Sequence, residues 1–256
     1  MKLIKSIALL TAAITLSGCV FHVGSSNARS ADIHLQESLT ITSEQLNMLE
    51  VESGSGELVI TGSDNVTEIT VKADIYTDND KNYDLSLKKV GSRAVLVAKN
   101  NSTSGFWNGN SPSIDLHVTV PKSLALDIDD GSGPIEVKNI NNKVTIDDGS
   151  GSLLVKNIQG DVTIEDGSGE LQVSNVSGNV DIDDGSGEMS IADISGSVKV
   201  VDGSGDMNIH HIGGSVTIDD GSGDIDLSDA GGLTITESGS GGLKVKDVKG
   251  EFNIDS

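Results

Sequence analysis

Residues 167–184 read Gly-Ser-Gly-Glu-Leu-Gln-Val-Ser-Asn-Val-Ser-Gly-Asn-Val-Asp-Ile-Asp-Asp, and this stretch decides the fold because its pattern recurs. The Gly-Ser-Gly tripeptide that opens it begins at residues 131, 149, 167, 185, 203, 221 and 239, always 18 residues apart. Seven such units fill residues 131–256. A fixed period of this length indicates a stacked array in which each unit packs against its neighbours.

Apolar residues occupy the same places in each unit. Counted from the first glycine as position one, they stand at positions five, seven, ten, fourteen and sixteen, which here are Leu171, Val173, Val176, Val180 and Ile182. Residues two apart lie on one face of a strand. Each unit is therefore predicted to contain two short strands, at positions five to seven and fourteen to sixteen, with an inward apolar residue at the bend between them.

The stacked units predict an all-β fold, a right-handed parallel β-helix (β-solenoid) with 18-residue coils. Each coil adds about 4.8 Å along the axis. Position twelve carries glycine in six units and Asn142 in the first, so we expect a left-handed bend there. In Leu233–Ser238 the apolar pair comes one position early and an extra residue follows it, which predicts a β-bulge. In the last unit Phe252 replaces the usual valine and is expected to close the open end.

The N-terminal half is predicted to form β-rich but less regular coils over residues 32–130, before the seven repeats at 131–256. Leu49–Ile60 repeats the strand, Gly-Ser-Gly, strand pattern of the later units. The polar stretch 100–113 is expected to be an exposed loop around Phe106 and Trp107. Two interpretations of this aromatic pair stay open: a specific binding contact, or a cap on the N-terminal end of the solenoid.

On these residues the chain resembles the bacterial DUF4097 family, also called putative adhesins or toastrack-like β-strand repeat proteins. The resemblance rests on Leu49–Ile60, on Val118–Leu124 leading into the repeats, and on the recurrent Ile-Asp-Asp-Gly-Ser-Gly. It covers nearly all of the mature chain. It implies a β-solenoid and an adhesin-like or envelope-associated role, and it brings no set of catalytic residues.

The first 31 residues are interpreted as a signal peptide followed by a tether. Residues 1–18 combine two lysines, a short apolar run and small residues, the pattern of a secretory signal. Leu16-Ser17-Gly18-Cys19 resembles the lipobox of bacterial lipoproteins, so 1–18 is predicted to be a lipoprotein signal peptide and 19–31 a lipidated tether. An ordinary secretory signal with an incidental cysteine is the alternative.

Cys19 is the only cysteine of the chain and is the predicted lipidation site. Its acyl chains (palmitate among them) would hold the protein at a membrane by burying methylene groups, at about 0.8 kcal/mol each. Val20 follows it, where an aspartate is associated with retention at the inner membrane. We therefore expect a lipid-anchored protein of the cell envelope, at the outer membrane.

The charge balance excludes one class of partner. Asp and Glu number 39 against 17 Lys and Arg, a net charge of −22. Nucleic acid is held by basic patches, so it is not an expected partner. An envelope protein or a polysaccharide is expected instead. Enzymatic activity is not predicted, because the histidines form no catalytic or zinc spacing and the repeats lack the aromatic platforms of sugar-cleaving clefts.

Acidic residues concentrate at positions seventeen and eighteen of each unit. One hypothesis is a divalent cation, Ca²⁺, that bridges carboxylates of adjacent coils. The other is that position eighteen accepts hydrogen bonds from the backbone of the glycine turn while position seventeen faces solvent. The candidate calcium residues are Asp147, Asp148, Asp166, Asp183, Asp184, Asp202, Asp219 and Asp220.

Together these features predict a lipid-anchored envelope β-solenoid that acts as a non-enzymatic, adhesin-like or scaffolding interaction module with an acidic face and no cofactor. The alternative is a calcium-dependent glycan-binding or glycan-cleaving envelope protein. The two differ in their outward surface, because an enzyme needs a cleft whose residues break the repeat.

Overall fold

The structure is a computed structural model that describes residues 30–79, 81–101, 107 and 109–254. These residues form twenty strands and no helix, and hence no helix that could cross a membrane. The first eight strands are β1 (Ile33–Thr42), β2 (Met48–Ser53), β3 (Leu58–Ser63), β4 (Glu68–Thr77), β5 (Tyr83–Val90), β6 (Arg93–Asn100), β7 (Ser113–Pro121) and β8 (Ala125–Asp130).

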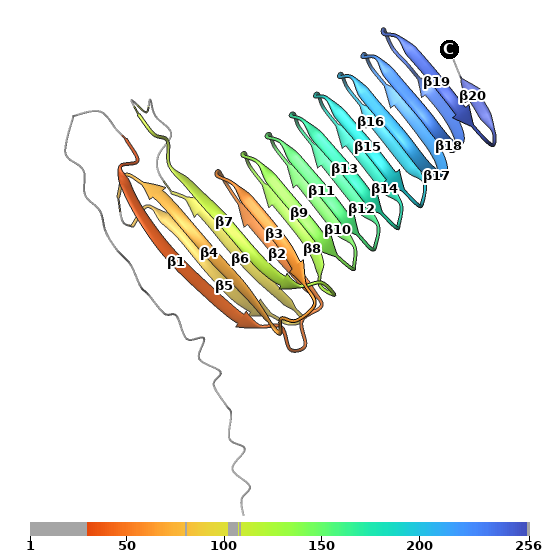
Figure 1. The fold of residues 1–256 in the computed structure, drawn as a ribbon. Helices are drawn as coiled ribbons and strands as arrows, with labels where there is room; N and C mark the ends of the chain where they lie inside the picture. Colours follow the sequence, from red (N-terminus) through yellow and green to blue (C-terminus); the bar gives the residue numbers. More distant parts are fainter. Residues whose placement is uncertain (1–29, 80, 102–106, 108, 255–256) are drawn as a thin grey trace, which may run out of the picture.

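The remaining strands build the repeats as a solenoid of 18-residue coils, which confirms the predicted architecture (Figure 1). They are β9 (Ile135–Ile140), β10 (Val144–Asp148), β11 (Leu153–Ile158), β12 (Val162–Asp166), β13 (Leu171–Val176), β14 (Val180–Asp184), β15 (Met189–Ile194), β16 (Val198–Asp202), β17 (Met207–Asp220), β18 (Ile225–Glu237), β19 (Leu243–Val248) and β20 (Phe252–Ile254).

Each coil contributes one strand to each of two faces. Positions five to ten form the first face, in which β9, β11, β13 and β15 pair in parallel. Positions fourteen to eighteen form the second face, in which β8, β10, β12, β14 and β16 pair in parallel. Both strands of a coil are longer than the three residues predicted. The first continues to position ten, and the second continues to position eighteen.

The core between the faces consists of the predicted apolar positions. Leu171, Val173, Val176, Val180 and Ile182 are each at most 1% exposed. A register of 18 places each beside its counterpart in the next coil, as Val162 lies beside Val180. Small aliphatic side chains fill this narrow interior without aromatic residues.

The left-handed bend lies at position nine and not at position twelve, so that prediction was wrong. All seven residues at position nine have φ between 53° and 62°; they are Asn139, Asn157, Asn175, Asp193, His211, Asp229 and Asp247. Asn, Asp and His are the non-glycine residues enriched in this region. Position twelve needs glycine for another reason: a Cβ on Gly178 would lie 2.4 Å from the carbonyl oxygen of Gly160 in the preceding coil.

The predicted bulge is present where β17 pairs with β18. The register shifts between Ile212 and Ser215 and is restored between Ile218 and Asp219, which lies opposite Glu237. One coil is thus a residue short before its second strand and regains that residue at its end. The stack continues through it to β19 and β20.

The N-terminal region adds one more coil and then antiparallel strands. β2 and β3 pair in parallel with β8 and β9, and Ser55 bridges Ser132, so the early Gly-Ser-Gly stacks directly on the first repeat. Beyond this coil, β7 extends the first face by a parallel pair with β3, and β4 and β1 then extend it by antiparallel pairs. The β5–β6 hairpin extends the second face (Figure 1).

Candidate functional site

A column of six aspartates runs inside the solenoid along the second face. Position eighteen shares the inward side of its strand with positions fourteen and sixteen, so its side chain enters the core. The six are at most 5% exposed; they are Asp130, Asp148, Asp166, Asp184, Asp202 and Asp220. Strand register places each beside the next along the column.

These carboxyls cap the glycine turn, as the second hypothesis predicted. In five coils Oδ1 accepts a hydrogen bond from the backbone N–H of the serine two residues later, at 3.0–3.2 Å, as Ser186 donates to Asp184. At the N-terminal end Ser53 Oγ donates to Asp130 at 2.5 Å. The other oxygen, Oδ2, is buried in all six and has no hydrogen-bond partner in the described structure.

Burial changes the acidity of the column. Loss of solvation, together with the charges of neighbouring aspartates in the column, raises the pKa of Asp148, Asp184 and Asp202 to about 6. Loss of solvation also raises the pKa of the other three members of the column. Asp148, Asp184 and Asp202 therefore take up protons at a mildly acidic pH.

The candidate calcium residues fall on two opposite sides of the strand. Asp147, Asp183 and Asp219, at position seventeen, are exposed, whereas the position-eighteen members are buried. Among the described residues no group of three or more His, Cys, Asp or Glu side chains is placed to hold a metal ion. Calcium binding thus stays a prediction. The structure places the position-seventeen and position-eighteen residues of this candidate site on opposite sides of the strand.

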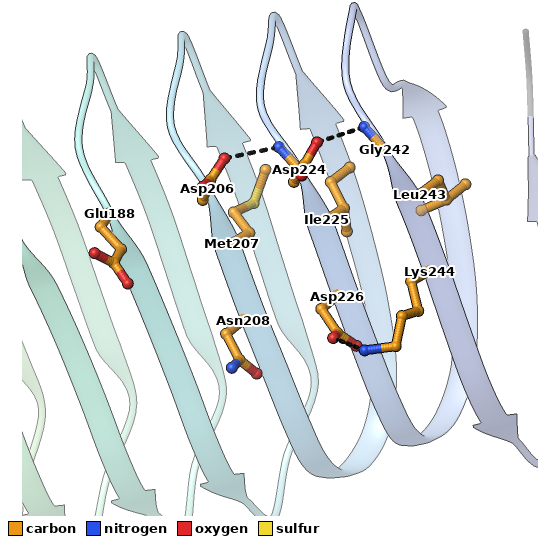
Figure 2. A pocket seen from close by; sticks show the side chains of 10 residues that line it. All are labelled: Glu188, Asp206, Met207, Asn208, Asp224, Ile225, Asp226, Gly242, Leu243 and Lys244. Atoms are coloured by element: carbon orange, nitrogen blue, oxygen red, sulfur yellow. Dashed lines mark hydrogen bonds and ion pairs between the residues drawn. The ribbon is translucent and has the colours of Figure 1, made fainter.

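A second acidic column lies on the outer surface at position four, at the start of the first-face strands. Its members Glu170, Glu188, Asp206 and Asp224 are all exposed. Asp206 Oδ1 accepts the backbone N–H of Asp224 at 3.0 Å, and Asp224 Oδ1 accepts that of Gly242 at 2.6 Å (Figure 2). These hydrogen bonds hold each carboxylate beside the next coil.

A shallow hollow of about 370 Å³ opens along this column. Figure 2 shows Glu188, Asp206 and Asp224 along one side of it and the Asp226–Lys244 ion pair at its C-terminal end. With position seventeen exposed on the other side of the glycine turn, acidic side chains flank the Gly-Ser-Gly corner from both faces. This arrangement suits a cationic ligand.

The predicted aromatic contact is described only in part. Phe106 lies outside the described residues. Trp107 is partly buried and lines a second surface hollow of about 460 Å³, together with Lys99 and Pro112. The hollow lies beside the early glycine turn, since Gly54 and Ser55 also line it.

Cys19, the signal peptide 1–18 and all of the tether except residues 30 and 31 also lie outside the described residues. Of the two tether residues that are described, Ala31 is buried and its N–H donates to the carbonyl of Asn110 at 2.9 Å. This hydrogen bond ties residue 31 to the folded body.

The fold and these surfaces define a class of protein: an all-β repeat module with acidic outer faces. More specifically, the chain belongs to the Toastrack DUF4097 family, whose model matches residues 74–256. This confirms the resemblance seen in the sequence. A comparison with curated proteins finds no match.

Several solved structures are similar at low identity. A structure from Bacteroides fragilis, titled a "putative adhesin", is 12% identical, with 86% of this chain and 97% of that chain covered and a TM-score of 0.44. Another "putative adhesin", from Parabacteroides distasonis, has the same identity and coverage and a TM-score of 0.42. A "putative cell adhesion protein" from Clostridium sporogenes is 11% identical over 86% of this chain and 99% of its own, with a TM-score of 0.36.

Proposed function

We propose that this protein is a lipid-anchored, non-enzymatic interaction module of the bacterial cell envelope, which presents acidic columns to a positively charged partner in an adhesin-like or scaffolding role. The observation that carries the proposal is the exposed column of Glu170, Glu188, Asp206 and Asp224, repeated in register on a rigid rod. Like charges held this close repel one another, so a cationic partner lowers their energy.

The repeat argues against catalysis as the role of this surface. A catalytic cleft needs a few side chains of different chemistry held together, whereas position four carries only carboxylates in four successive coils, and position seventeen is acidic in most coils, with Val201 as an exception. The partner is an envelope protein or polysaccharide with cationic groups. Cys19 supplies the membrane attachment, at the outer membrane.

The acidic columns can be tested with variants that keep every hydrogen-bond acceptor. Changing Glu170→Gln, Glu188→Gln, Asp206→Asn and Asp224→Asn together removes four charges from position four. The matched control removes four from position seventeen, by Asp147→Asn, Glu165→Gln, Asp183→Asn and Asp219→Asn. The probe is a short oligolysine peptide, and binding to the full chain is measured by calorimetry.

We expect the position-four variant to weaken oligolysine binding more than the control does, because only that column lines the hollow of Figure 2. Equal losses in both variants would mean attraction to net charge alone. Absence of binding to the unmodified chain would remove the proposal for a cationic partner. For the anchor, Cys19→Ala should move the protein from the membrane fraction to the soluble fraction of cells.

A second candidate function is calcium-dependent glycan binding or cleavage. Trp107 is the observation that favours it, because an indole beside Lys99 in a surface hollow can stack on a sugar ring while the ammonium donates to its hydroxyls. Trp107→Ala should then abolish binding to an envelope polysaccharide without changing the melting temperature. A lower melting temperature with unchanged binding would identify Trp107 as a structural cap.

A further inference from the structure

The two ends of the solenoid differ in how they are finished. At the N-terminal end β1 and β5 contact each other, and Tyr83 Oη donates to the Glu37 carboxylate at 2.5 Å. Leu35, Leu85 and Leu87 pack against the core beneath them. This end is closed by side chains that meet across the two faces.

The C-terminal end has no such closure among the described residues. Leu243 is 40% exposed, Phe252 52% and Ile254 38%, although the same positions in the preceding coils are at most 2% exposed. Phe252 was expected to close the stack; instead its ring is half in solvent. The core positions of the last coil are thus open to solvent.

The last coil also has unpaired backbone edges. Of the described strands, β19 and β20 pair only with β18, so each leaves one edge without a strand partner (Figure 1). A free edge beside exposed apolar side chains is a template for another strand. Any occupant must supply both an edge for hydrogen bonding and an apolar surface for the core.

We propose that the occupant is a second copy of this chain, joined tail to tail about a two-fold axis through its own C-terminal coil. A second copy brings the same open edge and the same row of Leu243, Phe252 and Ile254, so the two cores become continuous. The N-terminal end is the poorer partner, because its Leu35, Leu85 and Leu87 are already partly buried against its own core. The dimer closes and does not grow into a fibre.

Charge selects the arrangement of the two copies. Three of the seven lysines of the repeat region lie in this coil, and two of them, Lys244 and Lys246, point outward from β19. Glu251 precedes β20 on the opposite face and is exposed. A two-fold axis parallel to the strands places β19 beside the other copy's β20, with lysine next to glutamate. An axis perpendicular to the faces would place lysine next to lysine, which is unfavourable.

The apolar part of the interface is tested by sedimentation velocity of the full chain in mild detergent, from low to high micromolar concentration. We expect a monomer–dimer equilibrium. Phe252→Lys with Ile254→Lys should yield monomer at every concentration. The matched control is Val90→Lys, an exposed valine (50%) at the end of β5, which should leave the dimer unchanged. Circular dichroism confirms that each variant is folded.

The charge arrangement is tested by exchange. Lys246→Glu alone and Glu251→Lys alone should each weaken the dimer about tenfold, and the two together should restore it. A chain that is monomeric at the highest concentration overturns the proposal. So does an oligomer that survives the Phe252 and Ile254 changes, or one that Val90→Lys dissociates. Failure of the charge exchange with a dimer otherwise intact overturns the axis parallel to the strands.

Discussion

Asp148 and Asp166 stand opposite each other in adjacent coils with both carboxyl groups inside the core. Their backbones are paired in parallel register, which keeps the two carboxyl groups beside each other in the column. Each keeps one oxygen on the glycine turn and one without a partner. Because the same aspartate caps the glycine turn in successive coils, the repeat produces a column of buried carboxyl groups that interact with one another.

The buried aspartates should make this protein more stable as the pH falls from about 6 towards about 4. Burial raises the pKa of Asp184 from 3.8 to about 6, so the folded chain binds the proton more tightly than the unfolded chain does. The cost of burying the ionised carboxylate is absent below pH 3.8. It grows as the pH rises from 3.8 to about 6 and reaches its full size above about 6. Thermal unfolding by circular dichroism should give a higher melting temperature at the lower pH. A melting temperature that is higher at the higher pH would contradict this.

Asp184→Asn should stabilise the protein at neutral pH by about 1–3 kcal/mol. The amide oxygen still accepts the hydrogen bond from Ser186, while the buried charge is removed. Denaturant unfolding at neutral pH measures the change. Asp183→Asn is the control, because Asp183 is exposed on the other side of the same strand and should have little effect. Equal stabilisation by both variants would point to net charge and not to burial.

At position nine, Asn175→Ala should destabilise the chain by about 1–2 kcal/mol, because φ is 56° there and alanine lacks the short polar side chain that lets asparagine tolerate this left-handed conformation. Asn175→Gly should cost less, since glycine adopts this φ without strain. Both variants delete the same amide, so their difference isolates the backbone. Chemical denaturation of the two proteins decides; an alanine variant as stable as the glycine variant would exclude backbone strain as the reason for Asn.

Gly169→Ala should destabilise the chain by about 3 kcal/mol or more. Its φ is 150°, and a Cβ would lie 1.5 Å from the carbonyl oxygen of Gly151 in the coil below. Gly91→Ala is the matched control: φ is again positive, at 64°, but nothing lies within 4 Å. It should cost only the conformational strain, about 1–2 kcal/mol. Comparable unfolding midpoints for the two variants would show that coil spacing tolerates a methyl group.

Much of the architecture could be predicted from the sequence because the apolar core positions recur at fixed places in each repeat. Val180 and Ile182 are two residues apart, and each unit has an equivalent apolar pair. A strand with one buried side explains that spacing. The error at Gly178 has a physical cause, since glycine serves both for positive φ and for close approach of two backbones. The signal for the true bend was the restriction of position nine to Asn, Asp and His.

Other features could not be read from the sequence because they depend on distant pairings. Ser55 bridges Ser132 although the intervening residues form six strands of their own, and nothing local specifies that partner. The turn cap at Asp148 was foreseen, but its burial was not, because a carboxylate is expected to remain in water. Its even spacing from Val144 and Ile146 placed it on the inward side all along.

The register of 18 residues makes the length of this protein adjustable in steps. Removing one whole unit, such as residues 167–184, joins an identical corner to an identical corner and leaves the closed N-terminal end and the last coil as they are. The rod would shorten by about 4.8 Å. Gene duplication or deletion of one repeat can therefore change the length of a repeat protein of this kind without altering either end.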